Sequence, residues 1–312
     1  MFNSKPVLSI GLPVFNGENF LRKALDSILL QTNRDFELII CDNASTDRTP
    51  QICREYSKFD KRTKYYRNKR NIGGPRNYNL AFKLSSGKYF KWAAHDDLLT
   101  PTYLQKCLDV LDADPSIVLC HSRVGRIDKN DALVGNYDSR TLEKISSWKP
   151  HERFSDMISR RNTCWAIHGV IRAESLAKTH LHGDYIDGDR NLLAELALLG
   201  RIYEIPDHLM LRRDHPQAYT SSFYSTPSQL QDYRSQLAWW TGERSNALIV
   251  LPYWKNCLEY FKSVNRVHLT VSERFKCYEE IIRLLIKEKG FQRMKGELVN
   301  EFQFWRTKLR HR

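Results

Sequence analysis

The chain has 312 residues, of which 41% are hydrophobic and 27% charged, and its formal net charge is +13 at pH 7. This length can bury a full core, and the composition is that of an ordinary globular protein. No apolar run approaches the roughly 18 residues that span a bilayer, and no signal-peptide-like segment precedes the first expected strand. Seven cysteines without a CxxC pair predict a reducing cytoplasm and neither a disulfide framework nor a zinc site.

The excess of positive charge narrows the set of partners. Nucleic acid, an anionic membrane face and phosphate-bearing substrates would each suit it. No helix-turn-helix, RRM or zinc-finger pattern accompanies the charge, so we expect no nucleic-acid partner.

Three short apolar runs in the first hundred residues each lead into polar residues. The runs are residues 7–12, 36–41 and 88–94, and they are followed by residues 13–16, 42–47 and 95–97. Short apolar runs between helical segments indicate buried strands of a parallel sheet. Ligands of such sheets bind outside the carboxyl ends of the strands. We therefore expect the three polar turns to converge on one crevice.

Helical periodicity and cap signals fill the spaces between these strands. We expect a helix over residues 20–29, a second helix with Thr46 or Asp47 as N-cap, and a strand over 64–67. A glycine-containing loop over 70–77 then opens a helix through residue 84, and Thr100-Pro101 begins another.

The remainder of the chain carries weaker signals. We expect a strand over 117–120, no clear period over 121–150, an extended segment over 164–171, a helix over 191–199 and a short strand over 201–205 that Pro206 ends. The pattern is helical from Thr226 onward, with a capping box at Thr270 and Glu273 and a stop at Gly290.

The order of these motifs resembles glycosyltransferase family 2. The carrying residues are Pro13-Val14-Phe15-Asn16, the run from Asp42 to Asp47, Asn71-x-Gly73 and Asp96-Asp97, and the resemblance runs from Val7 to His215. It implies an α/β fold of the GT-A type, a Rossmann-like, mostly parallel sheet flanked by helices, with a C-terminal helical extension. Residues 1–100 would form the half that binds the nucleotide sugar, 101–220 the half that binds the acceptor, and 221–312 the extension.

The resemblance also implies an inverting transfer of a sugar from a nucleotide diphosphate, most simply a UDP-sugar, to a hydroxyl acceptor. Asp42 matches the position that accepts the uracil imide N–H. The residues expected to complete the nucleotide site are Pro13, Phe15, Asn16, Glu18, Asn71, Arg76, Asp96, Arg212 and Arg213. For the Asp42 turn, the alternative is a helix-capping turn.

A divalent cation, Mg²⁺ or Mn²⁺, would neutralise the leaving diphosphate. Asp96 and Asp97 match the end of the family's Asp-x-Asp-Asp turn, whose first position here is Ala94. His215 follows the basic pair Arg212-Arg213 and is a further candidate metal ligand, with a lone histidine in a polar loop as the alternative.

The transfer needs a base that takes the proton of the acceptor hydroxyl. Asp189 takes the family's aspartate position ahead of a Leu- and Ala-rich helix, whereas Gly188 stands where the family has glutamate. Asp187 and Asp184 remain competitors for this role, and N-capping is the alternative for each of the three.

The C-terminal segment from Phe291 is basic and amphipathic. It would suit an anionic membrane face, but an ordinary surface helix or an oligomer contact explains it as well. We therefore expect a cytoplasmic enzyme, free or bound at the inner membrane face, that glycosylates a saccharide or lipid-linked acceptor during surface polysaccharide or glycolipid assembly. The alternatives are a non-catalytic nucleotide-sugar-binding scaffold and a sugar-phosphate nucleotidylyltransferase.

Overall fold

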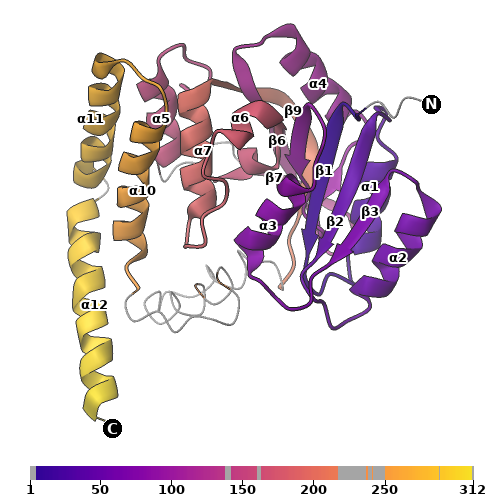
Figure 1. Cartoon of the computed structure of the whole chain (residues 1–312), viewed down its shortest axis with the longest axis horizontal. Coiled ribbons are helices and arrows are strands. Elements are labelled where there is room, and N and C mark those ends of the chain that lie inside the picture. The colour runs from indigo at the N-terminus through magenta and orange to yellow at the C-terminus, as the bar shows by residue number, and fades with distance from the viewer. Residues whose placement is uncertain are drawn as a thin grey trace.

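A computed structural model describes residues 5–137, 142–159, 163–216, 237, 241, 250–287 and 289–310. Strands and helices alternate through the first two thirds of the chain, and helices follow (Figure 1). The strands are β1 (Leu8–Val14), β2 (Phe36–Asp42), β3 (Thr63–Arg67), β4 (Tyr89–Trp92), β5 (Leu98–Leu99), β6 (Ile117–Ile127), β7 (Leu133–Asn136), β8 (Val170–Arg172) and β9 (Arg201–Arg213). The helices are α1 (Leu21–Leu29), α2 (Thr49–Phe59), α3 (Gly74–Lys83), α4 (Tyr103–Ala113), α5 (Pro150–Ile158), the 3₁₀ helix η1 (Trp165–His168), α6 (Ala173–Ala177), α7 (Gly188–Leu199), α10 (Pro252–Arg266), α11 (Val271–Lys287) and α12 (Gly290–Arg310).

The strands form one sheet in the order β3-β2-β1-β4-β8-β6-β9-β5, with β7 paired to β6. The first four of these strands are parallel to one another. Strand β8 is antiparallel to both of its neighbours, whereas β6 and β9 are parallel. The expected parallel sheet is therefore found in its first half, and the second half is mixed because β8 runs in the opposite direction to β4 and β6.

Helices cover both faces of the parallel half, and this explains why its strands are apolar throughout. Leu38 and Ile40 belong to the core that includes α1 and α4, whereas Ile39 and Cys41 pack with Ala81 of α3. Helix α3 approaches closely because Gly11 has no side chain: a Cβ there would lie 2.8 Å from the Cβ of Ala81. The strand ends are thereby held between helices on both sides (Figure 1).

Two helices begin later than the cap signals predicted. Helix α2 has Arg48 at its cap position, although Asp47 still accepts the N–H of Thr49 at 2.9 Å. Helix α4 begins at Tyr103 because Thr100 first donates its N–H to Leu209 of β9, at 2.9 Å. A tertiary hydrogen bond thus accompanies the later start of α4, whereas the bond of Asp47 at α2 is local.

Strands β6 and β9 are much longer than the predicted 117–120 and 201–205. They pair in parallel over their whole lengths, and the register shifts where Ser122 and Arg123 face Ile205 and His208. Pro206 lies in this irregularity, where a missing backbone N–H breaks no ladder hydrogen bond. The predicted extended segment over 164–171 is instead the 3₁₀ helix η1 followed by β8.

The C-terminal helices α10, α11 and α12 stand at the side of the molecule away from α2, with α7 between them and the sheet (Figure 1). The capping box is confirmed, since Thr270 and Glu273 exchange hydrogen bonds of 2.9 and 3.2 Å. Gly290, expected as a stop, is the first residue of α12. The predicted helix start at Thr226 lies outside the described residues. No described helix has the length and apolarity to cross a bilayer. All seven cysteines are free and buried.

Candidate active site

A pocket of about 290 Å³ lies at the carboxyl ends of β1 and β2. Its walls come from the turns after these strands, from the loop that opens α3 and from one residue of the C-terminal region: Phe15, Ala44, Thr46, Arg70, Asn71, Ile72, Arg76 and Thr241. Three predicted nucleotide-site residues, Phe15, Asn71 and Arg76, are among them. Sequence reasoning gave Thr46 only a capping role and did not single out Ala44, Ile72 or Thr241.

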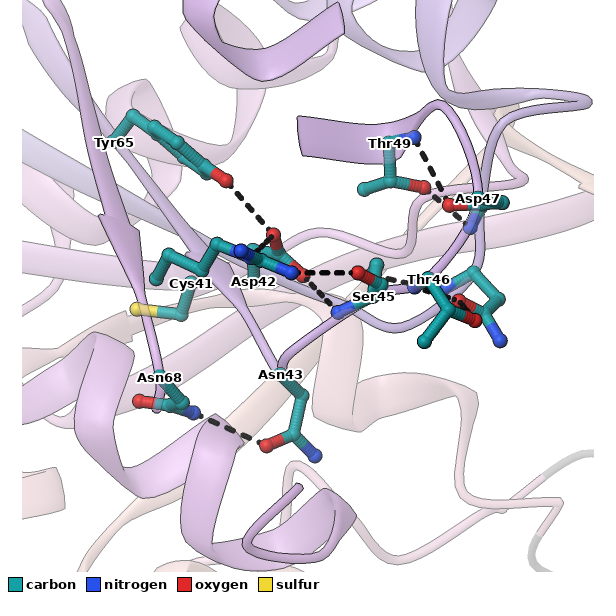
Figure 2. Close-up of polar contacts among 12 residues, drawn as sticks. Cys41, Asp42, Asn43, Ser45, Thr46, Asp47, Thr49, Tyr65 and Asn68 are labelled. Atoms are coloured by element: carbon teal, nitrogen blue, oxygen red, sulfur yellow. Dashed lines mark hydrogen bonds and ion pairs between the residues drawn. The ribbon is translucent and has the colours of Figure 1, made fainter. Parts of the chain in front are cut away.

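Asp42 lies at the end of β2 with a fully buried carboxylate. Figure 2 shows its hydrogen bonds: it accepts the N–H of Ser45 at 2.8 Å and the hydroxyl of Tyr65 at 2.8 Å. Arg67 donates to it at 3.1 Å and also reaches the carbonyl of Ser45. Asp42 therefore holds the turn that forms the pocket wall. A contact with the nucleotide stays a prediction.

Asn43 organises the loop on the other side of the pocket. Its carboxamide oxygen accepts the side-chain N–H of Asn68 at 3.1 Å (Figure 2). It also accepts the backbone N–H of Ile72 at 2.9 Å. Its amide group donates to Asn71 at 2.8 Å. Asn71 in turn accepts the N–H of Gly73, so the loop is already held in shape. The contact of Asn71 with the nucleotide stays a prediction. Asn43 is thus a positioning residue.

The turns after β1 and β2 are tied together by hydrogen bonds. Asn16 accepts the N–H of Thr46 at 2.8 Å, and Glu18 accepts the N–H of Arg48 at 2.9 Å. Pro13 is buried inside β1 opposite Cys41 and does not line the pocket. Pro13, Phe15, Asn16 and Glu18 were all predicted to belong to the nucleotide site. Of these four residues, Phe15 alone lines the pocket, and Asn16 and Glu18 support the pocket wall.

The turn after β4 carries Asp96 and Asp97 to the same edge of the sheet. Asp96 Oδ2 lies 3.0 Å from His215 Nε2, so the structure brings two predicted metal ligands together. Burial by itself raises the pKa of Asp96, but the charge of His95 and the hydrogen bond with His215 outweigh it, and the pKa falls below its usual range. Burial and the neighbouring Asp96 charge raise the pKa of Asp97.

The ligand types of Asp96 and Asp97 suit a hard divalent cation, but the number of grouped protein ligands is small. Among the residues that the structure describes, no three His, Cys, Asp or Glu side chains are grouped to hold a metal ion. Carboxylate oxygens are the ligands that Mg²⁺ and Mn²⁺ prefer, and such ions take further ligands from substrate phosphates and water. The Nδ1 atom of His215 is buried without a hydrogen-bond partner. Asp96 would hold the cation, with Asp97 and His215 beside it.

The predicted phosphate-binding arginines have other partners in the structure. The side chain of Arg213 is fully buried, and its guanidinium donates to the carbonyls of Asp96 and Asp128 at 2.9 Å each. It therefore holds the carboxylate turn in place. Arg212 lies 4.4 Å from the ring centre of Trp165 and 5.3 Å from that of Tyr137. Their contact with a diphosphate stays a prediction.

Asp189 lies in the first turn of α7, and Asp187 precedes it in a left-handed conformation with φ of 62°. Asp189 accepts the N–H of Arg190 at 2.8 Å. Burial and the charge of Asp187 raise the pKa of Asp189 to about 6. A Cβ on Gly188 would lie 2.6 Å from the Gly183 carbonyl oxygen, which explains why a glycine replaces the family's glutamate.

The charges of Asp96, Asp97 and Asp189 all act on one side chain, that of Tyr78. Burial raises the pKa of Tyr78, and the charges of these three carboxylates raise it further. Tyr78 belongs to α3, the helix whose first turn lines the pocket. The expected metal-binding turn and the expected base therefore converge beside the pocket.

Two contacts join the pocket to the loop that carries Asp189. Arg76 and Asp184 form an ion pair of 3.0 Å, with both side chains about half exposed. Asn79 exchanges hydrogen bonds of 2.9 and 3.0 Å with the backbone of His182. Asp184, a competitor for the base, thus pairs with a predicted phosphate-binding residue.

Comparisons with known proteins agree with this geometry. The model of the glycosyl transferase family 2 matches residues 9–177. An uncharacterized glycosyltransferase of Haemophilus influenzae is 28% identical over 233 residues, 70% of this chain and 69% of that one. An uncharacterized glycosyltransferase of Rickettsia typhi is 36% identical over 153 residues, 48% of this chain and 43% of that one. The match thus covers less than half of this second relative.

Solved structures show the same fold. S. aureus TarS 1–349, solved in complex with UDP-GlcNAc, has a TM-score of 0.54 at 17% identity and 91% coverage of both chains. The mannosyltransferase PcManGT from Pyrobaculum calidifontis, solved with GDP-Man and Mn²⁺, has a TM-score of 0.53 at 14% identity, covering 96% of this chain and 86% of that one.

Proposed function

Because this chain belongs to glycosyl transferase family 2 and is a glycosyltransferase of the GT-A fold, we propose that it transfers a sugar from a UDP-sugar to a hydroxyl acceptor with inversion. The observation that carries the proposal is the position of the strand-end pocket and the Asp96-Asp97 turn at one edge of the sheet, with the loop before Asp189 joined to the pocket by the Arg76–Asp184 ion pair. The complex of TarS with UDP-GlcNAc supports a uridine donor. Nothing in the comparisons favours a nucleotidylyltransferase or a non-catalytic scaffold.

In the proposed site, the base packs on Phe15, whose side chain is 43% exposed at the pocket wall. The diphosphate extends toward Asp96, with Arg76 and Arg70 at the same pocket as counter-charges. A divalent cation bound at Asp96 would neutralise charge on the leaving diphosphate. The N-terminus of α3 adds backbone N–H groups that favour an anion.

Asp189 takes the proton of the acceptor hydroxyl as the hydroxyl oxygen attacks the anomeric carbon. The bond between that carbon and the diphosphate oxygen breaks, and UDP leaves with the electron pair. One displacement of this kind inverts the anomeric configuration. A carboxylate with a pKa of about 6 is ionised at neutral pH and is more basic than an ordinary aspartate. We place the acceptor, a saccharide or lipid-linked sugar of surface polysaccharide or glycolipid assembly, beside α7.

Calorimetry with UDP and GDP tests the donor. We expect UDP to bind more tightly than GDP, and Phe15→Ala to weaken UDP binding by about 1–3 kcal/mol, the range for stacking of a base on an aromatic ring. Phe59→Ala is the matched control, because Phe59 is 85% exposed on α2 and lies outside the pocket. Tighter binding of GDP would contradict the uridine donor and leave the fold assignment intact.

Release of UDP from candidate donors tests the transfer and the cation. Chelator-treated enzyme should lose activity and regain it with Mg²⁺ or Mn²⁺. Full turnover in chelator would contradict metal dependence and make Arg76, Arg212 or Arg213 the counter-charge. A protein that binds UDP-sugars but never consumes them, with or without acceptors, would be a scaffold.

A further inference from the structure

Helix α11 exposes a continuous apolar stripe. Val271, Phe275, Ile282 and Ile286 are 72%, 63%, 48% and 65% exposed. Their spacing of four, seven and four residues places them on one face of the helix. The adjacent face of the helix carries Cys277, Ile281 and Leu285, which are buried. Since the core is already complete on that side, the exposed stripe is not needed for folding.

Helix α12 carries an exposed apolar row of its own. Phe291, Leu298 and Phe302 are 58%, 48% and 70% exposed and recur at intervals of seven and four residues. The other side of α12 is fastened to α10: Glu297 accepts the N–H of Tyr253 at 2.9 Å, and the Trp254 indole donates to the carbonyl of Met294 at 3.0 Å.

The two helices follow one another along the edge of the molecule that faces away from the sheet (Figure 1). We call the exposed apolar residues the α11–α12 stripe: Phe275, Ile282, Ile286, Phe291, Leu298 and Phe302.

The charges around the stripe have one dominant sign. The exposed cations of the two helices and their junction are Lys276, Arg283, Lys287, Lys289, Arg293, Lys295 and Arg306. Among the residues described there, Glu279 is the exposed anion. Of the other described carboxylates, Glu273 caps Thr270, Glu280 binds Ser155, Glu297 binds the start of α10, and Glu301 is half-buried. Among these cations, Arg283 forms ion pairs with Glu279 and Glu280. The outer face therefore combines apolar side chains with a positive rim.

We propose that the α11–α12 stripe binds an anionic lipid surface, with both helices lying along the membrane plane. Apolar side chains at this spacing insert at the boundary of headgroups and acyl chains, and lysine and arginine beside them attract anionic lipid. A second copy of the chain would bring two faces of the same sign together, so charge opposes that occupant. The inference does not depend on the transfer reaction, but it would bring the enzyme to lipid-linked acceptors.

Sedimentation of the full chain with vesicles tests the proposal. We expect binding to equimolar phosphatidylglycerol and phosphatidylcholine vesicles at low salt, weaker binding as salt rises, and much weaker binding to pure phosphatidylcholine. Ile282→Ser combined with Ile286→Ser and Phe302→Ser should lower the partition at least tenfold. The matched control is Phe59→Ser, which removes an equally exposed aromatic residue from α2 and should leave the partition unchanged.

A second variant keeps the test independent of the apolar substitutions. Lys276→Glu, Lys287→Glu and Lys295→Glu together should lower binding roughly 100-fold, because each cation near such a surface contributes about fivefold. UDP affinity and the thermal midpoint serve as folding controls for every variant. No binding of the wild-type chain at low salt, or equal binding of either triple variant, would overturn the proposal. So would sedimentation velocity showing a dimer in solution that the apolar variant dissociates.

Discussion

The two ends of the site are built in different ways. Around the pocket, hydrogen bonds fasten one turn to the next, as between Asn16 and Thr46 and between Asn43 and Ile72. At α7, the carboxylate of Asp189 accepts the backbone N–H of Arg190, and its pKa is raised. The first arrangement keeps the shape of the pocket fixed, which suits binding a rigid nucleobase. The second leaves a carboxylate ready to accept a proton, which suits chemistry.

The largest effect should come from removing the base. Asp189→Asn keeps the shape of the side chain and removes its basicity, so turnover should fall by about 10²–10⁴-fold with UDP affinity nearly intact. Steady-state kinetics and calorimetry measure the two quantities. Asp187→Asn is the control from the same loop. Near-normal turnover of Asp189→Asn, with Asp187→Asn inactive, would move the base to Asp187.

A substitution at the pocket should affect stability as well as binding. Asp42→Ala leaves the Ser45 N–H, Tyr65 and Arg67 without their buried acceptor. The free energy of unfolding should fall by about 1–3 kcal/mol, the cost of an unsatisfied buried polar group. Denaturant titration measures it, with Asp109→Ala on the exposed surface of α4 as the control. If the folded variant binds UDP as tightly as the wild type, Asp42 has no contact with the base.

The pH dependence should follow Asp189. The active form is the ionised carboxylate, and burial and Asp187 raise its pKa to about 6. The specificity constant kcat/KM should be level above neutral pH and fall about tenfold per pH unit below pH 6. Asp189→Asn should lose this acid limb. An acid limb of unchanged midpoint in that variant would assign the titration to another group.

The smallest effect should distinguish the members of the ion pair that joins the two ends of the site. Both Arg76 and Asp184 are about half exposed, so breaking the pair should change the unfolding free energy by less than about 1 kcal/mol. Arg76→Ala should weaken UDP binding several-fold, because Arg76 lines the pocket. Asp184→Ala should not weaken it, since it leaves Arg76 available to the diphosphate. Equal losses in the two variants would mean that the ion pair itself shapes the pocket.

Features set by short segments were predictable from the sequence. The apolar runs that became β1, β2 and β4 and the turns that follow them carried the family resemblance and the location of the site. The capping box at Thr270 was equally local. These features depend on residues that are close in the sequence, whose conformational preferences do not require tertiary contacts.

Features set by distant partners were not predictable. Strand β9 continues past Pro206 because its pairing with β6 accommodates an irregularity there. Arg213 was expected in the nucleotide site, and no local signal pointed to its hydrogen-bond partner, the carbonyl of Asp96, 117 residues away in the chain. Tyr65 and Arg67 had no signal that pointed to Asp42. In each case the folded sheet brings together residues that are far apart in the sequence, and no local sequence pattern predicts such a contact.

The burial of every cysteine makes the thiols internal reporters of opening. They occur from β2, at Cys41, to α11, at Cys277, and burial raises the pKa of both to about 12. A maleimide should therefore react only with molecules in which a segment has opened. Pulse labelling followed by peptide mass spectrometry would rank the cysteines by opening free energy. It would show whether the helical extension opens before the sheet and whether a vesicle surface protects it.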